Sequence, residues 1–97
     1  MPRISQNAEK YAMEDFQREI RSKQGYYNLM SFRALGAAAD IPHVTLWAKL
    51  KEPDKLEVAE LRKLVKTIRP DPFILLALLG YSRQDIKRAK NRLEEIA

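Results

Sequence analysis

The segment Phe32–Lys51 constrains the fold of this chain more than any other part of the sequence. Its apolar residues recur at three- and four-residue intervals on both sides of the tripeptide Asp40-Ile41-Pro42, which predicts two short helices joined by a turn. The residues that would face inward are Leu35, Gly36, Ala39, Leu46 and Leu50. Two helices joined by so short a turn pack at a steep angle, and we therefore expect a close approach where they cross.

Gly36 is the residue that permits this approach, because it has no side chain at the expected crossing point. Its cost is helix propensity, about 1 kcal/mol relative to Ala. The following run Ala37–Ala39 is the best available helix former and offsets part of that cost. Asp40 is expected to leave the first helix with a positive φ, which Asp tolerates better than most residues. Ile41 would then fill the angle between the helices.

Helices are also predicted on both sides of this segment. We expect a flexible arm over residues 1–6 and an amphipathic helix from about Asn7 to Gln24, ended by Gly25. Three helices should follow, the first over Lys55–Ile68 and two more within the C-terminal region of about 72–96, where Ile86, Ala89, Leu93 and Ile96 would form an inner stripe. The predicted N-caps are Ser31, Asp54, Asp71 and Ser82.

The sequence therefore predicts a compact all-α domain of five to six helices. No segment sustains the alternation of apolar and polar residues that marks a strand. A length of 97 residues provides for one domain, which we expect over residues 7–97. The domain would contain the helical pair at about 32–51 and the C-terminal helices at about 72–96.

The charge balance favours an anionic partner without identifying it. The chain has 18 Lys and Arg against 13 Asp and Glu, a net charge of +5, and the excess is spread along its length. The densest basic stretch is 83–92, which would either follow phosphates or form a solvated face. Its charged residues are Arg83, Asp85, Lys87, Arg88, Lys90 and Arg92.

Several classes of protein are disfavoured by what the sequence lacks. There is no cysteine, so disulfides and thiol chemistry are excluded and a reducing compartment is expected. The longest apolar run, Phe73–Leu79, is far shorter than the roughly 18 residues of a membrane span, and no signal peptide is recognisable. We expect a cytoplasmic protein without a membrane partner.

Catalysis is not expected either. The carboxylates fall on polar faces or loops, and the 3 glycines form no phosphate-binding loop. A single His without Cys does not make a metal site. The sequence therefore predicts no catalytic residue, no metal, no cofactor and no small-molecule substrate.

The central segment resembles the helix-turn-helix of the phage repressor and Cro-like (Xre) family of DNA-binding proteins. The resemblance covers roughly Phe16–Ile68, with Pro53 and the helix Lys55–Ile68 similar to the family's following loop and leucine-rich helix. The matching positions within the motif are Gly36, Asp40, Ile41, Leu46 and Leu50. Asp40 stands where the family usually has Gly, and Pro42 where Ser or Thr usually caps the second helix.

The resemblance implies that the second helix, from His43 to about Lys51, enters the major groove of double-stranded DNA. Its outward pairs would be His43 with Val44 and Trp47 with Ala48, while the start of the preceding helix would lie near a phosphate. The residues to which the resemblance assigns DNA contacts are Ser31, Arg33, His43, Val44, Thr45, Trp47, Ala48, Lys49 and Lys51.

Each of these residues also has a plainer interpretation. His43 is either a donor to DNA or a surface histidine, and Val44 and Ala48 either contact thymine methyl groups or are ordinary surface residues. Trp47 either packs on DNA or folds back onto the fourth helix, and the basic residues bind phosphates or are only solvated. The outward set lacks Asn, Gln and Arg, the strongest base readers, so we expect limited direct readout.

Taken together, these features predict a DNA-binding transcriptional regulator. A symmetric homodimer, built from part of the C-terminal apolar surface, would place two recognition helices on a palindromic site. The main alternative is a protein–protein interaction module, such as an antirepressor or adaptor, that uses the helix-turn-helix as a scaffold and Trp47 as its contact. A small phage assembly protein without catalytic activity is a third hypothesis.

Overall fold

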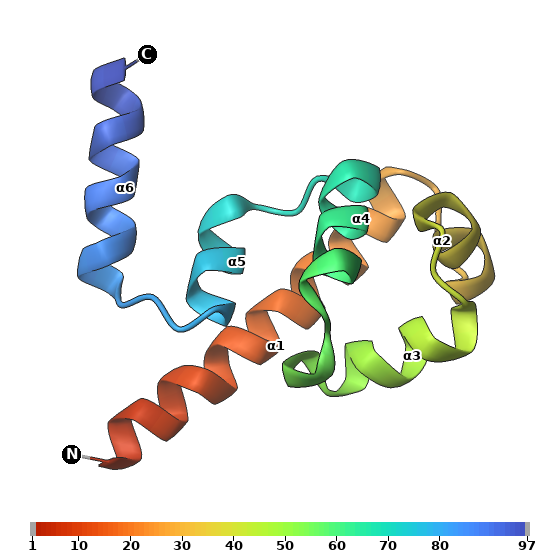
Figure 1. Cartoon of the computed structure of the whole chain (residues 1–97), viewed down its shortest axis with the longest axis horizontal. Helices are drawn as coiled ribbons and strands as arrows, with labels where there is room; N and C mark the ends of the chain where they lie inside the picture. The colour runs from red at the N-terminus through yellow and green to blue at the C-terminus, as the bar shows by residue number, and fades with distance from the viewer. Residues whose placement is uncertain (1, 97) are drawn as a thin grey trace.

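The computed structural model describes the backbone of residues 2–96 and the side chains of residues 8–95. Within that range the chain forms six α-helices and one 3₁₀ turn, with no strand, which confirms the all-α prediction (Figure 1). The helices are α1 (Pro2–Tyr26), α2 (Phe32–Ala39), α3 (His43–Lys51), α4 (Val58–Ile68), α5 (Pro72–Leu78) and α6 (Arg83–Ile96), and the 3₁₀ turn η1 is Pro53–Lys55.

The first helix is longer at both ends than the sequence predicts. It begins at Pro2, so residues 2–6 are helical rather than a loose arm, and Met1 lies outside the described residues. Gly25 does not end the helix, because the left-handed turn is made by Asn28, with φ of 59°. The N–H of Leu29 donates to the carbonyl of Gln24 at 2.7 Å and closes this turn.

The core lies between the C-terminal half of α1 and the helices α2, α3 and α4. Each of these four helices contributes at least one side chain that is almost completely shielded from solvent. These side chains are Phe16, Ile20, Leu35, Leu46, Leu64 and Ile68. The expected inward residues of the central segment are therefore core residues, and the amphipathic stripe of α1 faces them.

The crossing of α2 and α3 has no room for a side chain at Gly36. A Cβ placed there would lie 2.6 Å from the carbonyl oxygen of Ile41 and 3.3 Å from the backbone of His43. Asp40 adopts the left-handed conformation, with φ of 58° and ψ of 46°, and the N–H of Ile41 donates to the carbonyl of Gly36 at 2.9 Å. The sequence prediction for this turn is confirmed in each respect.

Three of the four predicted N-caps are confirmed by hydrogen bonds. Ser31 accepts from the N–H of Ala34, Asp71 from that of Phe73, and Ser82 from that of Asp85. The prediction for Asp54 was wrong, because Pro53–Lys55 forms a separate 3₁₀ turn and α4 begins only at Val58 with Glu57 as its N-cap.

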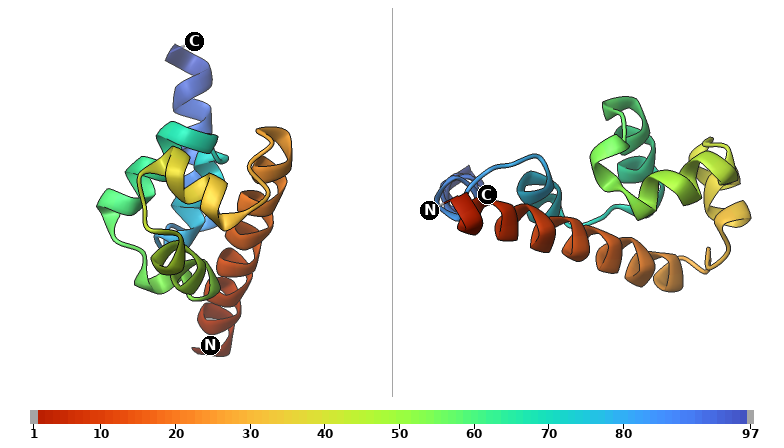
Figure 2. Two further views of the ribbon diagram at one scale, coloured as in Figure 1. Left: turned by 90° about the vertical axis from the view of Figure 1, so that its right-hand side faces the viewer. Right: turned by 90° about the horizontal axis from the view of Figure 1, so that it is seen from below.

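Of the last two helices, α5 packs against this core through Ile74, Leu75 and Leu78, and only α6 extends away from it. Helix α5 runs beside α1, and the side-chain carboxylate of Glu19 accepts the N–H of Asp71 at 2.7 Å. Helix α6 packs on α5 and stands apart from α2, α3 and α4 (Figures 1 and 2). The expected inner stripe is only partly covered, since Leu93 is 56% exposed, and the side chain of Ile96 lies outside the described ones.

The geometry at Gly36 predicts that Gly36→Ala destabilises the protein, by about 1–3 kcal/mol, because the added methyl group collides with backbone atoms that cannot move independently. Gly25→Ala is the matched control. Its Cβ would meet only the sulfur of Met30 at 3.8 Å, and the gain in helix propensity should stabilise α1 by roughly 0.5–1 kcal/mol. Urea unfolding followed by circular dichroism measures both changes, and equal effects of the two substitutions would contradict the crossing described above.

The left-handed conformation of Asp40 predicts that Asp40→Gly raises the unfolding free energy by about 0.5 kcal/mol, because Gly adopts positive φ without steric cost. The substitution removes only weak contacts of the Asp40 side chain. The ion pair of Asp40 with Lys63, at 3.7 Å, is exposed, and the 2.9 Å hydrogen bond from Lys63 goes to the backbone carbonyl that Gly retains. Asp40→Ala should instead lower the unfolding free energy, because Ala is strained at positive φ. Thermal unfolding of the two variants measures both changes.

Candidate nucleic-acid interface

One side of α3 is part of the core and the other side is open to solvent. Leu46 and Leu50 are buried against the other helices. Val44 is 66% exposed and Trp47 is 47% exposed. The remaining exposed residues of the helix are His43, Ala48 and Lys51. The four side chains expected to face outward therefore all do so, whereas Thr45 is half-buried at the edge of this face.

Trp47 is held by a neighbour on its own helix. The ammonium of Lys51, one turn further along, lies 3.6 Å from the centroid of the indole ring, which is a cation–π contact. The ring borders a hollow that is lined by residues of α1, α2 and α3 and by none of α4. Trp47 is 47% exposed, and the residues that share this hollow with it come from α1, α2 and α3.

This hollow beside Trp47 combines an apolar floor with a basic rim. Its volume is about 260 Å³, and its lining residues are Gln17, Ile20, Arg21, Gln24, Phe32, Trp47, Leu50 and Lys51. The lining includes two cations, Arg21 and Lys51, and no carboxylate. Such a site favours an anionic group, and the phosphate of a nucleic acid backbone is one.

Arg21 and Gln17 are two lining residues of this site that were not expected from the sequence. They lie on α1, outside the motif that carried the expectation, and one helical turn apart. The side-chain amide of Gln17 donates to the carbonyls of Leu50 at 2.9 Å and Lys51 at 3.1 Å, so it ties the end of α3 to α1. The sequence shows only that Gln17 and Arg21 lie on the same face of α1. It does not show that this face meets the C-terminal end of α3.

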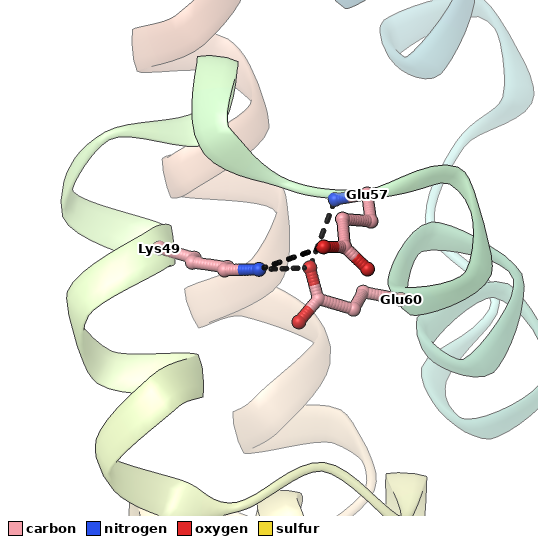
Figure 3. A network of polar contacts seen from close by, with 3 residues as sticks. All are labelled: Lys49, Glu57 and Glu60. Carbon is pink, nitrogen blue, oxygen red and sulfur yellow. Dashed lines mark hydrogen bonds and ion pairs between the residues drawn. The ribbon is translucent and has the colours of Figure 1, made fainter.

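Lys49 lies in a different place from the one expected. Its ammonium donates to the carboxylate of Glu60 at 2.8 Å and lies 3.9 Å from that of Glu57, and so it joins α3 to the start of α4 (Figure 3). The Lys49 and Glu60 side chains are 23% and 13% exposed. The same Glu60 oxygen accepts the backbone N–H of Glu57 at 2.8 Å. Lys49 thus has two carboxylates as neighbours and is a poorer candidate for a phosphate contact than Lys51.

The ion pair changes how both of its members titrate. The hydrogen bond to Glu60 raises the pKa of Lys49; partial burial opposes this rise, and the charges of Glu60 and Glu57 add to it. Burial by itself would raise the pKa of Glu60. The hydrogen bonds from Lys49 and from the N–H of Glu57, with the charges of Lys49 and Lys63, outweigh burial, so the pKa of Glu60 lies below its ordinary value. Both groups are therefore charged at neutral pH.

The remaining candidates lie at the turn end of α3. Arg33 and His43 line a shallow hollow of about 420 Å³ together with the crossing residue Gly36 and the turn residues. Pro42 precedes α3 and gives it no side-chain cap. Ser31 is occupied as the N-cap of α2, through its bond to Ala34. Each end of α3 thus has an arginine beside it. Arg33 lies near His43 at the start of the helix, and Arg21 lies near Lys51 at its end.

The described part of the chain offers few other kinds of site. No group of three His, Asp or Glu side chains that could hold a metal ion occurs in it. None of its helices combines the length and the apolar character that crossing a bilayer requires. Comparisons with protein-family models, with curated proteins and with solved structures found no match to this chain.

The ion pair of Lys49 and Glu60 predicts how stability depends on pH. Because the pKa of Glu60 is lower in the folded state, its contribution is complete above the unfolded-state value of about 4.3 and is lost as the pH falls through the lowered folded value. Glu60→Gln should therefore be less stable than the parent protein at pH 7, and the difference should shrink as the pH falls through the folded-state pKa of Glu60. Urea unfolding at a series of pH values measures it.

Glu52→Gln is the control for this series, because the ion pair of Glu52 with Lys55 is exposed and should contribute little at any pH. A difference between Glu60→Gln and the parent protein that stays constant from pH 7 to acid would show that the charge of Glu60 is not what stabilises this contact.

Proposed function

We propose that this protein is a DNA-binding transcriptional regulator of the phage repressor and Cro-like type, with α3 as the helix that enters the major groove. The observation that carries the proposal is the solvent-exposed face of α3, which is fixed where α3 closely approaches α2 at Gly36. A helix presented in this way matches the geometry of the helix-turn-helix, in which the second helix reads the groove while the first crosses the backbone.

The charges around α3 support a polyanionic partner. Arg21 and Lys51 border one end of the helix and Arg33 the other. Within the described residues, the side chains of Arg21 and Arg33 form no ion pair or hydrogen bond, so they are available to phosphates without breaking an internal contact. We assign the main phosphate contacts to these three residues, and Lys49 to the internal ion pair instead.

Base recognition in this proposal depends on few groups. Val44 and Ala48 present methyl groups of the size and polarity that suit the thymine methyl, and His43 presents a ring nitrogen at the start of α3. Trp47, with its ring held by Lys51, suits contact with a sugar of the backbone. Affinity would therefore come mostly from phosphates and only partly from direct readout.

One observation favours a second candidate function, a protein–protein interaction module. The exposed face of α3 carries Val44, Trp47 and Ala48 and is more apolar than most surfaces that read DNA. A half-exposed Trp beside exposed aliphatic residues is also the kind of anchor found at the centre of protein interfaces. Salt dependence separates the two functions, because counterion release accompanies binding to DNA.

The decisive experiment is a titration of labelled mixed-sequence duplex DNA with the protein, followed by fluorescence anisotropy at several salt concentrations. We expect an association constant that falls steeply with salt. Lys51→Ala and Arg21→Ala should each weaken binding and reduce the slope of log K against log salt by about one, the value for one lost phosphate contact.

Arg18→Ala is the matched control, since it removes an arginine of α1 that pairs with Asp15 at 3.3 Å and does not line the hollow. It should leave the slope unchanged. Absent or salt-insensitive binding by the parent protein would overturn the proposal in favour of the protein-binding module. If the parent protein binds, selection of bound sites from random duplexes then defines the recognised sequence.

A further inference from the structure

The hollow beside Trp47 has an apolar lining that a phosphate group would not use. Ile20 and Leu50 line it and are themselves core residues, 2% and 7% exposed. Phe32 packs against the same core, and the indole ring of Trp47 completes the apolar part of the lining. Two aromatic rings and two aliphatic side chains around one small volume favour a flat apolar group, such as an aromatic ring.

The same hollow contains a fixed hydrogen-bond acceptor. Gln24 lines it and is only 5% exposed. The side-chain nitrogen of Gln24 donates to the carbonyls of Leu29 at 3.0 Å and Met30 at 3.3 Å, which fixes the orientation of the amide. Its Oε1 accepts no bond from the described residues, and none of their fully buried side-chain polar atoms lacks a partner, so Oε1 lies on the small exposed part of Gln24. A ligand with a hydroxyl or N–H group would supply the missing donor.

Two cations of the hollow would hold a negative charge. Arg21 and Gln24 lie three residues apart on α1, so they share a face and are separated by about 4.5 Å along the helix axis. Lys51 approaches from α3, with its ammonium over the ring of Trp47. Within the described residues neither Arg21 nor Lys51 forms an ion pair. A carboxylate in the hollow would therefore meet two positive charges and no negative one.

The size of the hollow limits what can occupy it. Its volume of about 260 Å³ lies below the range for drug-sized ligands, roughly 300–1,000 Å³, and suits a single substituted ring. We propose that the hollow beside Trp47 binds a small aromatic carboxylic acid that carries a hydroxyl or N–H group. The ring lies among the apolar side chains, the carboxylate contacts Arg21 and Lys51, and the donor bonds to Oε1 of Gln24.

This inference goes beyond the proposed DNA-binding function and does not depend on it. A nucleic acid phosphate would use only the two cations and would leave the apolar lining and the oxygen of Gln24 without contacts. If both proposals hold, the small acid and the DNA backbone compete for Arg21 and Lys51. The experiments below use no DNA, so their failure would leave the DNA-binding proposal to its own test.

The first experiment titrates the full chain with para-hydroxyphenylacetate, which combines a ring, a carboxylate and a hydroxyl group. Isothermal titration calorimetry should give a dissociation constant of about 0.1–1 mM, the range expected of so small a ligand. In amide NMR spectra of the labelled protein, the residues that line the hollow should show the largest changes in chemical shift. Changes centred on another part of the chain would contradict the proposed site.

Two analogues test the polar contacts without altering the protein. para-Hydroxyphenylacetamide is neutral and should bind about tenfold more weakly, because it loses the charge-assisted contacts with Arg21 and Lys51. Phenylacetate lacks the hydroxyl group and should bind roughly threefold to tenfold more weakly, because it makes no bond to Gln24. NMR titration measures these weaker affinities, and equal binding of all three compounds would overturn the proposal.

A pair of variants tests the site from the side of the protein. Arg21→Ala should raise the dissociation constant for para-hydroxyphenylacetate by roughly threefold to tenfold. Arg18→Ala removes an arginine of the same helix that pairs with Asp15 and does not line the hollow, so it should leave the dissociation constant unchanged. Circular dichroism verifies that both variants keep their helices. Equal effects of the two substitutions would show that only the overall charge matters.

Three further outcomes would each overturn the proposal. The first is the absence of binding at ligand concentrations well above the expected dissociation constant. The second is inorganic phosphate binding as tightly as para-hydroxyphenylacetate, which would make the hollow a simple anion site. The third is a peptide ending in tyrosine that binds more than about tenfold tighter than the free acid, since the occupant would then be the terminus of another protein.

Discussion

The close backbone approach at Gly36 is the constraint on which the rest of the structure depends. The carbonyl of Ile41 and the backbone of His43 occupy the space that a side chain would need, so any side chain at position 36 would push α3 away from its observed direction. That direction puts Leu46 and Leu50 into the core and the other face of α3 into solvent. The exposed face therefore follows from one missing side chain together with the left-handed conformation of Asp40.

Two polar contacts then hold the far end of α3. Gln17 donates to the last carbonyls of the helix from α1, and Lys49 reaches the carboxylate of Glu60 on α4. The helix is thus attached to α1, α2 and α4, and these contacts hold its exposed face in one orientation. The two lysines of its last turn have separate roles, because Lys49 turns inward to a carboxylate whereas Lys51 stays outside over the ring of Trp47.

Features that depend only on residues close together in the chain could be predicted from the sequence. The apolar spacing of the central segment, the caps at Ser31, Asp71 and Ser82, and the turn at Asp40 all depend on residues within a few positions of one another. The prediction failed at Asp54, where a 3₁₀ turn could not be distinguished from the first turn of a helix.

The site itself was less predictable because it depends on contacts between distant residues. Nothing near Lys49 in the sequence shows that Glu60 will lie within reach of its ammonium, and nothing near Arg21 shows that Trp47 and Lys51 will be its neighbours. The exposed stripe of α6 was likewise expected to be an inner one, since its spacing alone does not tell whether the chain supplies enough surface to cover Leu93.

The placement of Trp47 has a spectroscopic consequence. It is the 1 tryptophan of the chain, so light absorbed and emitted at indole wavelengths reports on a single ring on the exposed face of α3. The Lys51 ammonium lies against that ring at 3.6 Å, and any partner that draws the ammonium away changes the electrostatic environment of the excited state. Trp47 is thus a built-in optical probe of the exposed face of α3, the surface to which the proposed function assigns a partner.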